Sequence, residues 1–276
     1  MERTIKENTI TEGVIWKQLL TFFFPILIGT FFQQLYNTVD TIVVGQYVGT
    51  QALAAVGTTG TLINLLVGFF VGVSSGATVI VSQFFGAGDA KNVSKSVHTS
   101  MALAIVGGLV IMVLGLLTAK PSLVLLGVPE EILGDALTYA IVYYCGIIAS
   151  MIYNVGTGVL RAIGDAKMPL YVLIVCCLVN IVLDLLFVLG FHWGVFGVAI
   201  ATVLSQVVSA LLILLRLMLT RECYRVELKR IRFDRSILKN VIRIGLPAGM
   251  QSVLYSVSNL VVQASINSFG TDAIAS

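Results

Sequence analysis

Long apolar segments recur along the whole chain and are separated by short stretches that carry charge, glycine or proline. Runs such as LAIVGGLVIMVLGLL do not alternate between polar and apolar positions, so they are typical of membrane-spanning α-helices and not of barrel strands. Helices of this kind need about 20 residues to cross a bilayer. The pattern predicts a seventh helix that begins near Ser236, after six complete ones at residues 15–46, 52–85, 96–118, 132–158, 169–190 and 195–219.

The composition supports an all-α polytopic membrane protein. Of the 276 residues, 57% are hydrophobic and 11% are charged, whereas soluble domains carry about 25% charged residues. Because apolar segments fill the chain, no separate soluble domain fits between them. The function must therefore reside in the helices and their short connections.

The basic residues are distributed unevenly between the two sides of the predicted membrane. All of the 17 lysine and arginine residues except Lys120 fall on one side. By the positive-inside rule this side is the cytoplasm, so we expect a multi-pass protein of the plasma membrane, the bacterial inner membrane, with a cytoplasmic N-terminus. The basic connector at residues 221–236, which carries Arg221 to Arg235, is interpreted as a topology signal that contacts anionic lipid, and nucleic acid is not expected as a partner.

The start of the seventh segment repeats the start of the first. Three pairs match at a spacing of 222 residues: Lys17 with Lys239, Pro25 with Pro247, and Asn37 with Asn259. A unit of six helices is even, so the two copies share one orientation and are related by a pseudo-twofold axis along the membrane normal. The repeat predicts a twelve-helix, two-lobe protein of about 450 residues.

This chain would then contain the N-lobe at residues 1–220, the linker at 221–236 and the truncated first helix of the C-lobe at 237–276. We expect the chain to be an N-terminal fragment that does not transport on its own.

Two carboxylates lie within the apolar segments, Asp40 in the first and Asp184 in the fifth. An ionised carboxylate in a bilayer costs several kcal/mol, so such residues normally face a cavity or a partner and mark ion pathways. With a helical rise of 1.5 Å per residue, both fall in the outer half of the membrane. Asn180, Thr202 and Tyr139 fall in the same layer. Such oxygen atoms suit a small alkali cation, and the same group could instead hold protons.

A structural explanation remains open for some of these residues. Thr202 and Tyr139 taken alone fit local helix contacts, because hydroxyl side chains are common in membrane helices. The stripe of Gly68, Gly72 and Gly76 is interpreted as a surface that lets a neighbouring helix approach closely, although a flexible seam is an alternative. Further polar side chains in the spans are candidates for lining a substrate cavity: Gln34, Tyr36, Asn37, Asn64, Tyr143 and Asn154.

Four motifs together resemble the multidrug and toxic compound extrusion (MATE) family, most closely its bacterial members. They are P-x11-N-x2-D at residues 25–40, GAGD at 86–89, LRAIGDAKMP at 160–169, and N-x3-D at 180–184. The resemblance implies a two-lobe antiporter, monomeric at full length, that exports organic and often cationic compounds by alternating access. It further implies that inward movement of Na⁺ or H⁺ drives the export.

The resemblance also assigns roles to residues of this sequence. It implies a cation site formed by Asp40, Asn180, Asp184 and Thr202, which would be the ligands of Na⁺ in a sodium-coupled protein, with Tyr139 nearby. No cofactor other than the coupling ion is expected.

Two other functions compete with antiport. A flippase for lipid-linked glycans or lipids, from the same superfamily, should place arginine or lysine in the cavity to hold a pyrophosphate, and the first six spans carry none at mid-depth. A membrane-embedded enzyme would need a nucleophile with its base, or metal ligands, within the spans. His98 and His192 lie at span ends and pair with neither, so we expect no enzymatic activity and no catalytic residue.

Overall fold

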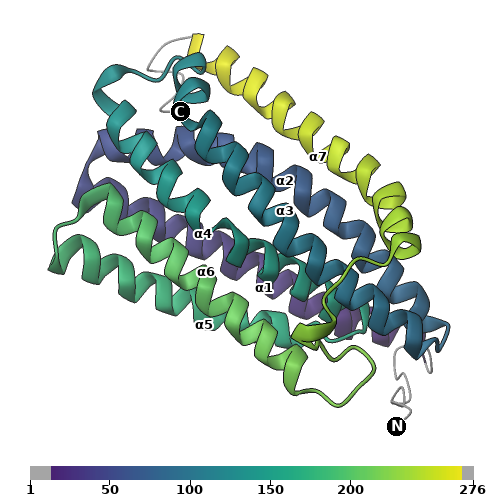
Figure 1. The fold of residues 1–276 in the computed structure, drawn as a ribbon. Coiled ribbons are helices and arrows are strands. Elements are labelled where there is room, and N and C mark those ends of the chain that lie inside the picture. Colours follow the sequence, from purple (N-terminus) through teal and green to yellow (C-terminus); the bar gives the residue numbers. More distant parts are fainter. Residues whose placement is uncertain (1–13, 269–276) are drawn as a thin grey trace.

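The computed structural model describes residues 14–268, with side chains described as far as Asn259. This part of the chain consists of seven long helices joined by short connections (Figure 1). Their bounds are α1 Ile15–Val43, α2 Thr50–Gly86, α3 Ala90–Leu125, α4 Glu130–Ala162, α5 Lys167–Leu185, α6 Gly194–Leu219 and α7 Arg235–Ser268. Short π-helical segments, Val44–Val48 and Leu186–Gly190, extend α1 and α5, and a 3₁₀ helix, Leu228–Arg230, lies in the linker.

The first six helices are each long and apolar enough to cross a membrane, which confirms the predicted all-α, multi-pass class. The seventh helix forms as predicted but is not among these six spans in the described part of the chain.

Helix α4 is the centre of the bundle and packs against α2, α3 and α6. Glycines make these contacts close: a Cβ atom on Gly146 or Gly156 of α4 would collide with Val203 or Ile213 of α6. The ring of Tyr144, which is fully buried, likewise occupies the space left by Gly115 of α3. Small residues at helix crossings are the usual way in which membrane helices approach each other.

The third helix is longer at both ends than the hydropathy pattern predicted. It begins at Ala90 and ends at Leu125, where the prediction was residues 96–118. Asp89 caps its N-terminus by accepting a hydrogen bond of 3.0 Å from the backbone N–H of Asn92. The first turns are polar and the last contain Pro121, so a boundary drawn by charge and proline stops short of both ends.

The remaining helices flank this core on opposite sides. Helix α5 packs on α6, and α1 packs mainly on α5, whereas α7 lies along α2 at the far edge of the bundle (Figure 1). Pro25 in α1 and Pro247 in α7 both lie inside their helices, as the repeat predicted. The chain thus places two helices of matching sequence, α1 and α7, on different sides of the bundle.

The glycine stripe of α2 has α7 as its partner. A Cβ atom on Gly72 would lie 2.5 Å from the Cα atom of Gly249, and one on Gly76 would lie 2.7 Å from the backbone nitrogen of Gly245. Gly68 is less tightly packed, since its nearest neighbour is the Cβ atom of Ser252 at 3.8 Å. The predicted close approach is confirmed for the first two positions.

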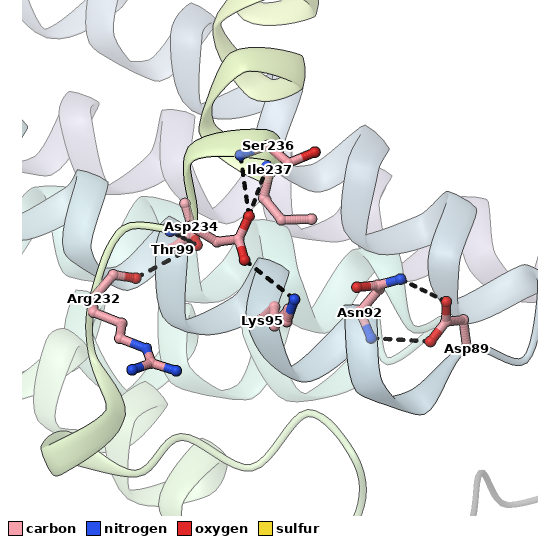
Figure 2. A network of polar contacts seen from close by, with 8 residues as sticks. All are labelled: Asp89, Asn92, Lys95, Thr99, Arg232, Asp234, Ser236 and Ile237. Carbon is pink, nitrogen blue, oxygen red and sulfur yellow. Dashed lines mark hydrogen bonds and ion pairs between the residues drawn. The ribbon is translucent and has the colours of Figure 1, made fainter.

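The linker between α6 and α7 folds back onto the start of α3. The backbone N–H of Glu227 donates to Nε2 of His98 over 3.1 Å, and the backbone N–H of Asp234 donates to the Thr99 hydroxyl over 3.1 Å. Figure 2 shows the second of these contacts together with the ion pair between Lys95 and Asp234, which are 3.3 Å apart. The linker is therefore a bound segment of the fold, a feature that the sequence pattern did not predict.

Candidate cation-coupling site

The packing of α1 on α5 brings the two predicted membrane carboxylates together. Asp40 lies near the end of α1 and Asp184 near the end of α5, and their carboxyl groups lie close enough to interact with each other. Asp184 has no exposed surface, and Asp40 is half-buried. Two carboxyl groups this close share a proton or a cation, because two bare negative charges in a buried site repel each other strongly.

Polar atoms around this pair lack hydrogen-bond donors and acceptors from the described residues. The unpaired buried atoms include Oδ1 of Asp40, both carboxylate oxygens of Asp184, and both side-chain amide atoms of Asn180. Buried polar groups are normally hydrogen-bonded, so a cluster of unpaired ones calls for a ligand. No lysine or arginine forms an ion pair with either carboxylate in the described structure.

Three helices supply the remaining members of the predicted site. Asn180 precedes Asp184 by one turn of α5 and is almost completely buried. From α6, Thr202 donates to the carbonyl of Val198 over 3.0 Å and is also buried. Tyr139 of α4 comes within hydrogen-bonding reach of the Thr202 hydroxyl. The structure thus groups Tyr139 with Thr202, and Asp40 with Asp184, at adjoining positions of the bundle.

Two of the predicted cavity residues belong to the same cluster. The hydroxyl of Tyr36, one turn before Asp40 on α1, comes within hydrogen-bonding reach of Thr202. The Tyr143 ring stacks on that of Tyr139 with centroids 6.2 Å apart and an interplanar angle of 25°. These aromatic side chains form a wall that links α1, α4 and α6.

Gln206 is a member of this cluster that the sequence reasoning missed. Its Nε2 donates to the Tyr143 hydroxyl over 3.2 Å, while its Oε1 is buried without a partner in the described structure. Gln206 lies four residues after Thr202, so the two share a helical face, as Asn180 and Asp184 do. That spacing, an amide one turn from a hydroxyl in an apolar helix, is the signal that could have identified it.

The other predicted cavity residues do not join the cluster. Asn37 donates to Oε1 of Gln34 over 3.4 Å, and both side chains are exposed on α1. Asn64 is exposed on α2. The amide of Asn154 donates to the Ser150 carbonyl of its own helix over 2.8 Å.

The donor set at this site consists of oxygen atoms from carboxyl, amide and hydroxyl groups. In the part of the chain that the structure describes, no three His, Cys, Asp or Glu side chains come together as a metal cluster. Hard oxygen donors suit an alkali cation, and two adjacent carboxyl groups suit a shared proton. Chemically, the arrangement can exchange one kind of positive charge for another inside the membrane.

Six apolar spans and a buried acidic cluster between them define a multi-pass α-helical membrane protein whose polar chemistry lies inside the bundle. The MatE family model matches residues 25–186. The chain belongs to the MatE family.

Sequence and structure comparisons give relatives along nearly the whole chain. The probable multidrug resistance protein YoeA of Bacillus subtilis is 28% identical over 268 residues, which is 95% of this chain and 58% of YoeA. The multidrug export protein MepA of Staphylococcus aureus is 26% identical over 269 residues, which is 96% of this chain and 59% of MepA.

A solved structure agrees with these relatives. The outward-facing conformation of a multidrug resistance MATE family transporter superimposes with a TM-score of 0.85 at 30% identity, covering 93% of this chain and 57% of that one. The chain thus spans less than two thirds of each of these relatives.

Proposed function

We propose that this chain provides the N-lobe of a secondary active antiporter, which exports organic and often cationic compounds in exchange for Na⁺ or H⁺ by alternating access. In this proposal Asp40, Asp184, Asn180 and Thr202 hold the coupling ion, and Tyr139 supports the site. Two further residues, Tyr36 and Gln206, complete the polar wall around it. The coupling ion is cargo and not a resident cofactor.

The single observation that carries the proposal is the contact between Asp40 and Asp184. Oδ1 of Asp40 and both carboxylate oxygens of Asp184 are buried in an apolar bundle, and neither residue has a lysine or arginine partner in the described structure. An uncompensated buried charge is strongly destabilising, so the pair gains stability whenever a cation or proton enters. Transport would follow if this occupancy favours one packing of α1 on α5 over another.

The test is efflux of a fluorescent organic cation by the full-length protein that contains this chain. Asp40→Asn and Asp184→Asn are each expected to lower the coupled efflux rate by at least about tenfold, the usual order for an essential ionisable group. The matched control is Asp135→Asn, an exposed carboxylate on α4. Efflux at the wild-type rate in both site variants would disprove the role of the pair, and separate Na⁺ and pH gradients identify the ion.

The competing flippase function is not favoured by the described residues. A lipid pyrophosphate needs fixed cations in the cavity, and the side chains gathered around Asp184 are acidic, amide, hydroxyl and aromatic. An enzymatic role is not favoured either, because the cluster contains no nucleophile with a base beside it.

The orientation and partners complete the proposal. The basic linker and the N-terminus lie in the cytoplasm, where the linker contacts anionic lipid, and the full-length protein acts as a monomer. Nucleic acid is not a partner. Reaction of a membrane-impermeant thiol reagent with a cysteine placed at residue 192 or at residue 229, in intact cells, tests the orientation: labelling is expected at the first position and not at the second.

A further inference from the structure

A cavity of about 1840 Å³ lies between the folded linker and the start of α3. Its wall includes the turn before α3, the first three turns of that helix and most of the linker. The basic residues that line it are Lys91, Lys95, Arg221, Arg225, Lys229, Arg230, Arg232 and Arg235. The cavity is separate from the cluster around Asp184, which lies near the opposite ends of α5 and α1.

The charge of this cavity is far from balanced. Eight lysine and arginine residues line it, with Asp234 as the one acidic residue of the wall, whereas the whole chain has a formal net charge of only +3. Lys95 pairs with Asp234, and Arg230 pairs with Glu227 over 2.8 Å. The other six basic residues form no ion pair with the described part of the chain. A concentration of like charges in a concave site raises the local potential and attracts anions.

The wall is held in place by the contacts between the linker and α3. His98 and Thr99 bind the linker backbone at Glu227 and Asp234, so the basic residues between them are attached at both ends. In Figure 2 the carbonyl of Arg232 takes part in this binding, while its guanidinium extends away from the carboxylate of Asp234. The cations between these two contacts, Lys229, Arg230 and Arg232, therefore belong to a fixed surface and not to a free loop.

Exposed apolar side chains lie in the lining of the cavity and next to its basic residues in the sequence. Phe233 lines the cavity and is 40% exposed. Leu219, at the end of α6, is 78% exposed, and Leu228 of the linker is 58% exposed. A cationic cavity with exposed apolar side chains beside it suits a ligand that has an anionic head and an apolar tail. A free anion would gain nothing from the apolar side chains.

We propose that this cavity binds the phosphate group of an anionic phospholipid from the leaflet on its side of the membrane. Arginine is suited to this role because its planar guanidinium binds phosphate oxygens through two parallel hydrogen bonds. Binding at this cavity does not depend on the proposed orientation of the protein. The inference rests on that orientation only where it identifies the leaflet as the cytoplasmic one. It gives the linker a specific lipid site, beyond its general attraction to a charged surface.

The test measures binding of short-chain phosphatidylglycerol to the purified chain in detergent, with short-chain phosphatidylcholine as the zwitterionic comparison. Wild-type protein is expected to prefer phosphatidylglycerol. The double variant Arg225→Gln/Arg232→Gln should weaken that binding about tenfold or more, because each basic residue near a phosphate contributes substantially. The matched double variant Lys120→Gln/Arg243→Gln removes the same charge outside the cavity and should change binding by less than about twofold.

Several outcomes would overturn the proposal. One is equal weakening of binding by both double variants, and another is no preference for phosphatidylglycerol over phosphatidylcholine. A third is competition by inorganic phosphate that is as strong as competition by the lipid, which would identify a free anion as the ligand. If the first double variant does not fold, Arg221→Gln/Lys229→Gln provides an independent pair from the same wall. Binding in detergent does not depend on transport, so failure of this proposal and failure of antiport are observed separately.

Discussion

Gly76 of α2 lies directly against Gly245 of α7, so that a Cβ atom on either glycine would come within 3.0 Å of the backbone of the other helix. Helix α2 belongs to the six-helix core, whereas α7 carries the repeated sequence of α1. The contact between α2 and α7 is thus made by the backbones of the two helices. Such a contact tolerates no side chain, and it fixes where α7 lies.

Replacing Gly76 by alanine should destabilise the chain. The added methyl group would meet the backbone of Gly245 at 2.7 to 2.9 Å, and backbone cannot rotate aside as a side chain can. Overpacking of this kind costs about 1–3 kcal/mol. Thermal unfolding of the purified chain in detergent measures the loss.

Gly57→Ala provides the control for that experiment, because Gly57 lies on the same helix with nothing within 4 Å of the added Cβ atom. Alanine there should be neutral, or stabilising by up to about 1 kcal/mol, since it is the better helix former. Equal unfolding temperatures for the Gly76→Ala and Gly57→Ala variants would contradict the close packing of α2 and α7.

His98 should prove necessary for holding the linker. Nδ1 of its ring lies 2.7 Å from the Ser94 carbonyl and donates to it, which leaves Nε2 to accept from the backbone N–H of Glu227. In His98→Ala the Glu227 N–H loses its acceptor, at a cost of about 1–3 kcal/mol. Trypsin should then cleave the linker about tenfold faster, because cleavage follows the population of the opened segment.

His192→Asn is the matched histidine variant for the trypsin experiment. His192 lies in the connection before α6 with a φ of 55°, a conformation that asparagine adopts readily. Its replacement should leave cleavage of the linker unchanged. A His98→Ala protein that resists trypsin as well as wild type does would show that the linker does not depend on the imidazole.

The stability contributed by Asp234 should depend on pH. The backbone N–H of Ile237, followed by Lys95, holds the pKa of Asp234 below its ordinary value. A carboxylate with a lowered folded-state pKa adds stability above its unfolded pKa of about 3.9, and this contribution is lost as the pH falls through the folded-state value. Asp234→Asn should therefore be less stable than wild type at pH 7, with the difference shrinking below about pH 4.

Unfolding temperatures of the two proteins across that pH range measure the difference. Asp135→Asn serves as the comparison, because Asp135 is exposed on α4 and forms no ion pair within the described structure. A gap between wild type and Asp234→Asn that stays constant down to pH 3 would refute the assignment.

Tyr143 and Gln206 should be energetically coupled. Each single replacement, Tyr143→Phe or Gln206→Leu, removes one partner of the 3.2 Å hydrogen bond and leaves the other, partly buried group without this partner. The double variant removes both, so its loss of stability should fall short of the sum of the single losses by about 1 kcal/mol. A double-mutant cycle on thermal unfolding measures this difference, and strict additivity would exclude the interaction.

The sequence determined the class of this protein and most of its helices. Uninterrupted apolar segments have no alternative to helix in a bilayer, since every backbone polar group must be satisfied within the segment. The same physics identified Asp40 and Asp184, because a carboxylate in such a segment is too costly to keep without a purpose. Their positions along the helices, converted to depth, also placed Asn180, Thr202 and Tyr139 in one layer.

The tertiary structure decided which of these residues meet. Depth fixes height in the membrane but not rotation or neighbours, so the sequence could not show that α1 packs on α5 and brings Asp40 against Asp184. Nor could the sequence show that Tyr36 and Tyr143 join the polar cluster around Asp184 whereas Asn64 and Asn154 do not. These outcomes depend on side-chain packing between helices that are distant in sequence.

The linker gives the clearest contrast between the two levels. Its basic residues were visible in the sequence and indicated a membrane surface, but charge alone gives no shape. Hydrogen bonds from Glu227 and Asp234 to His98 and Thr99, more than 120 positions apart in sequence, turn the segment into the wall of a cavity. Sequence set the sign of the charge, and long-range backbone contacts decided where that charge is concentrated.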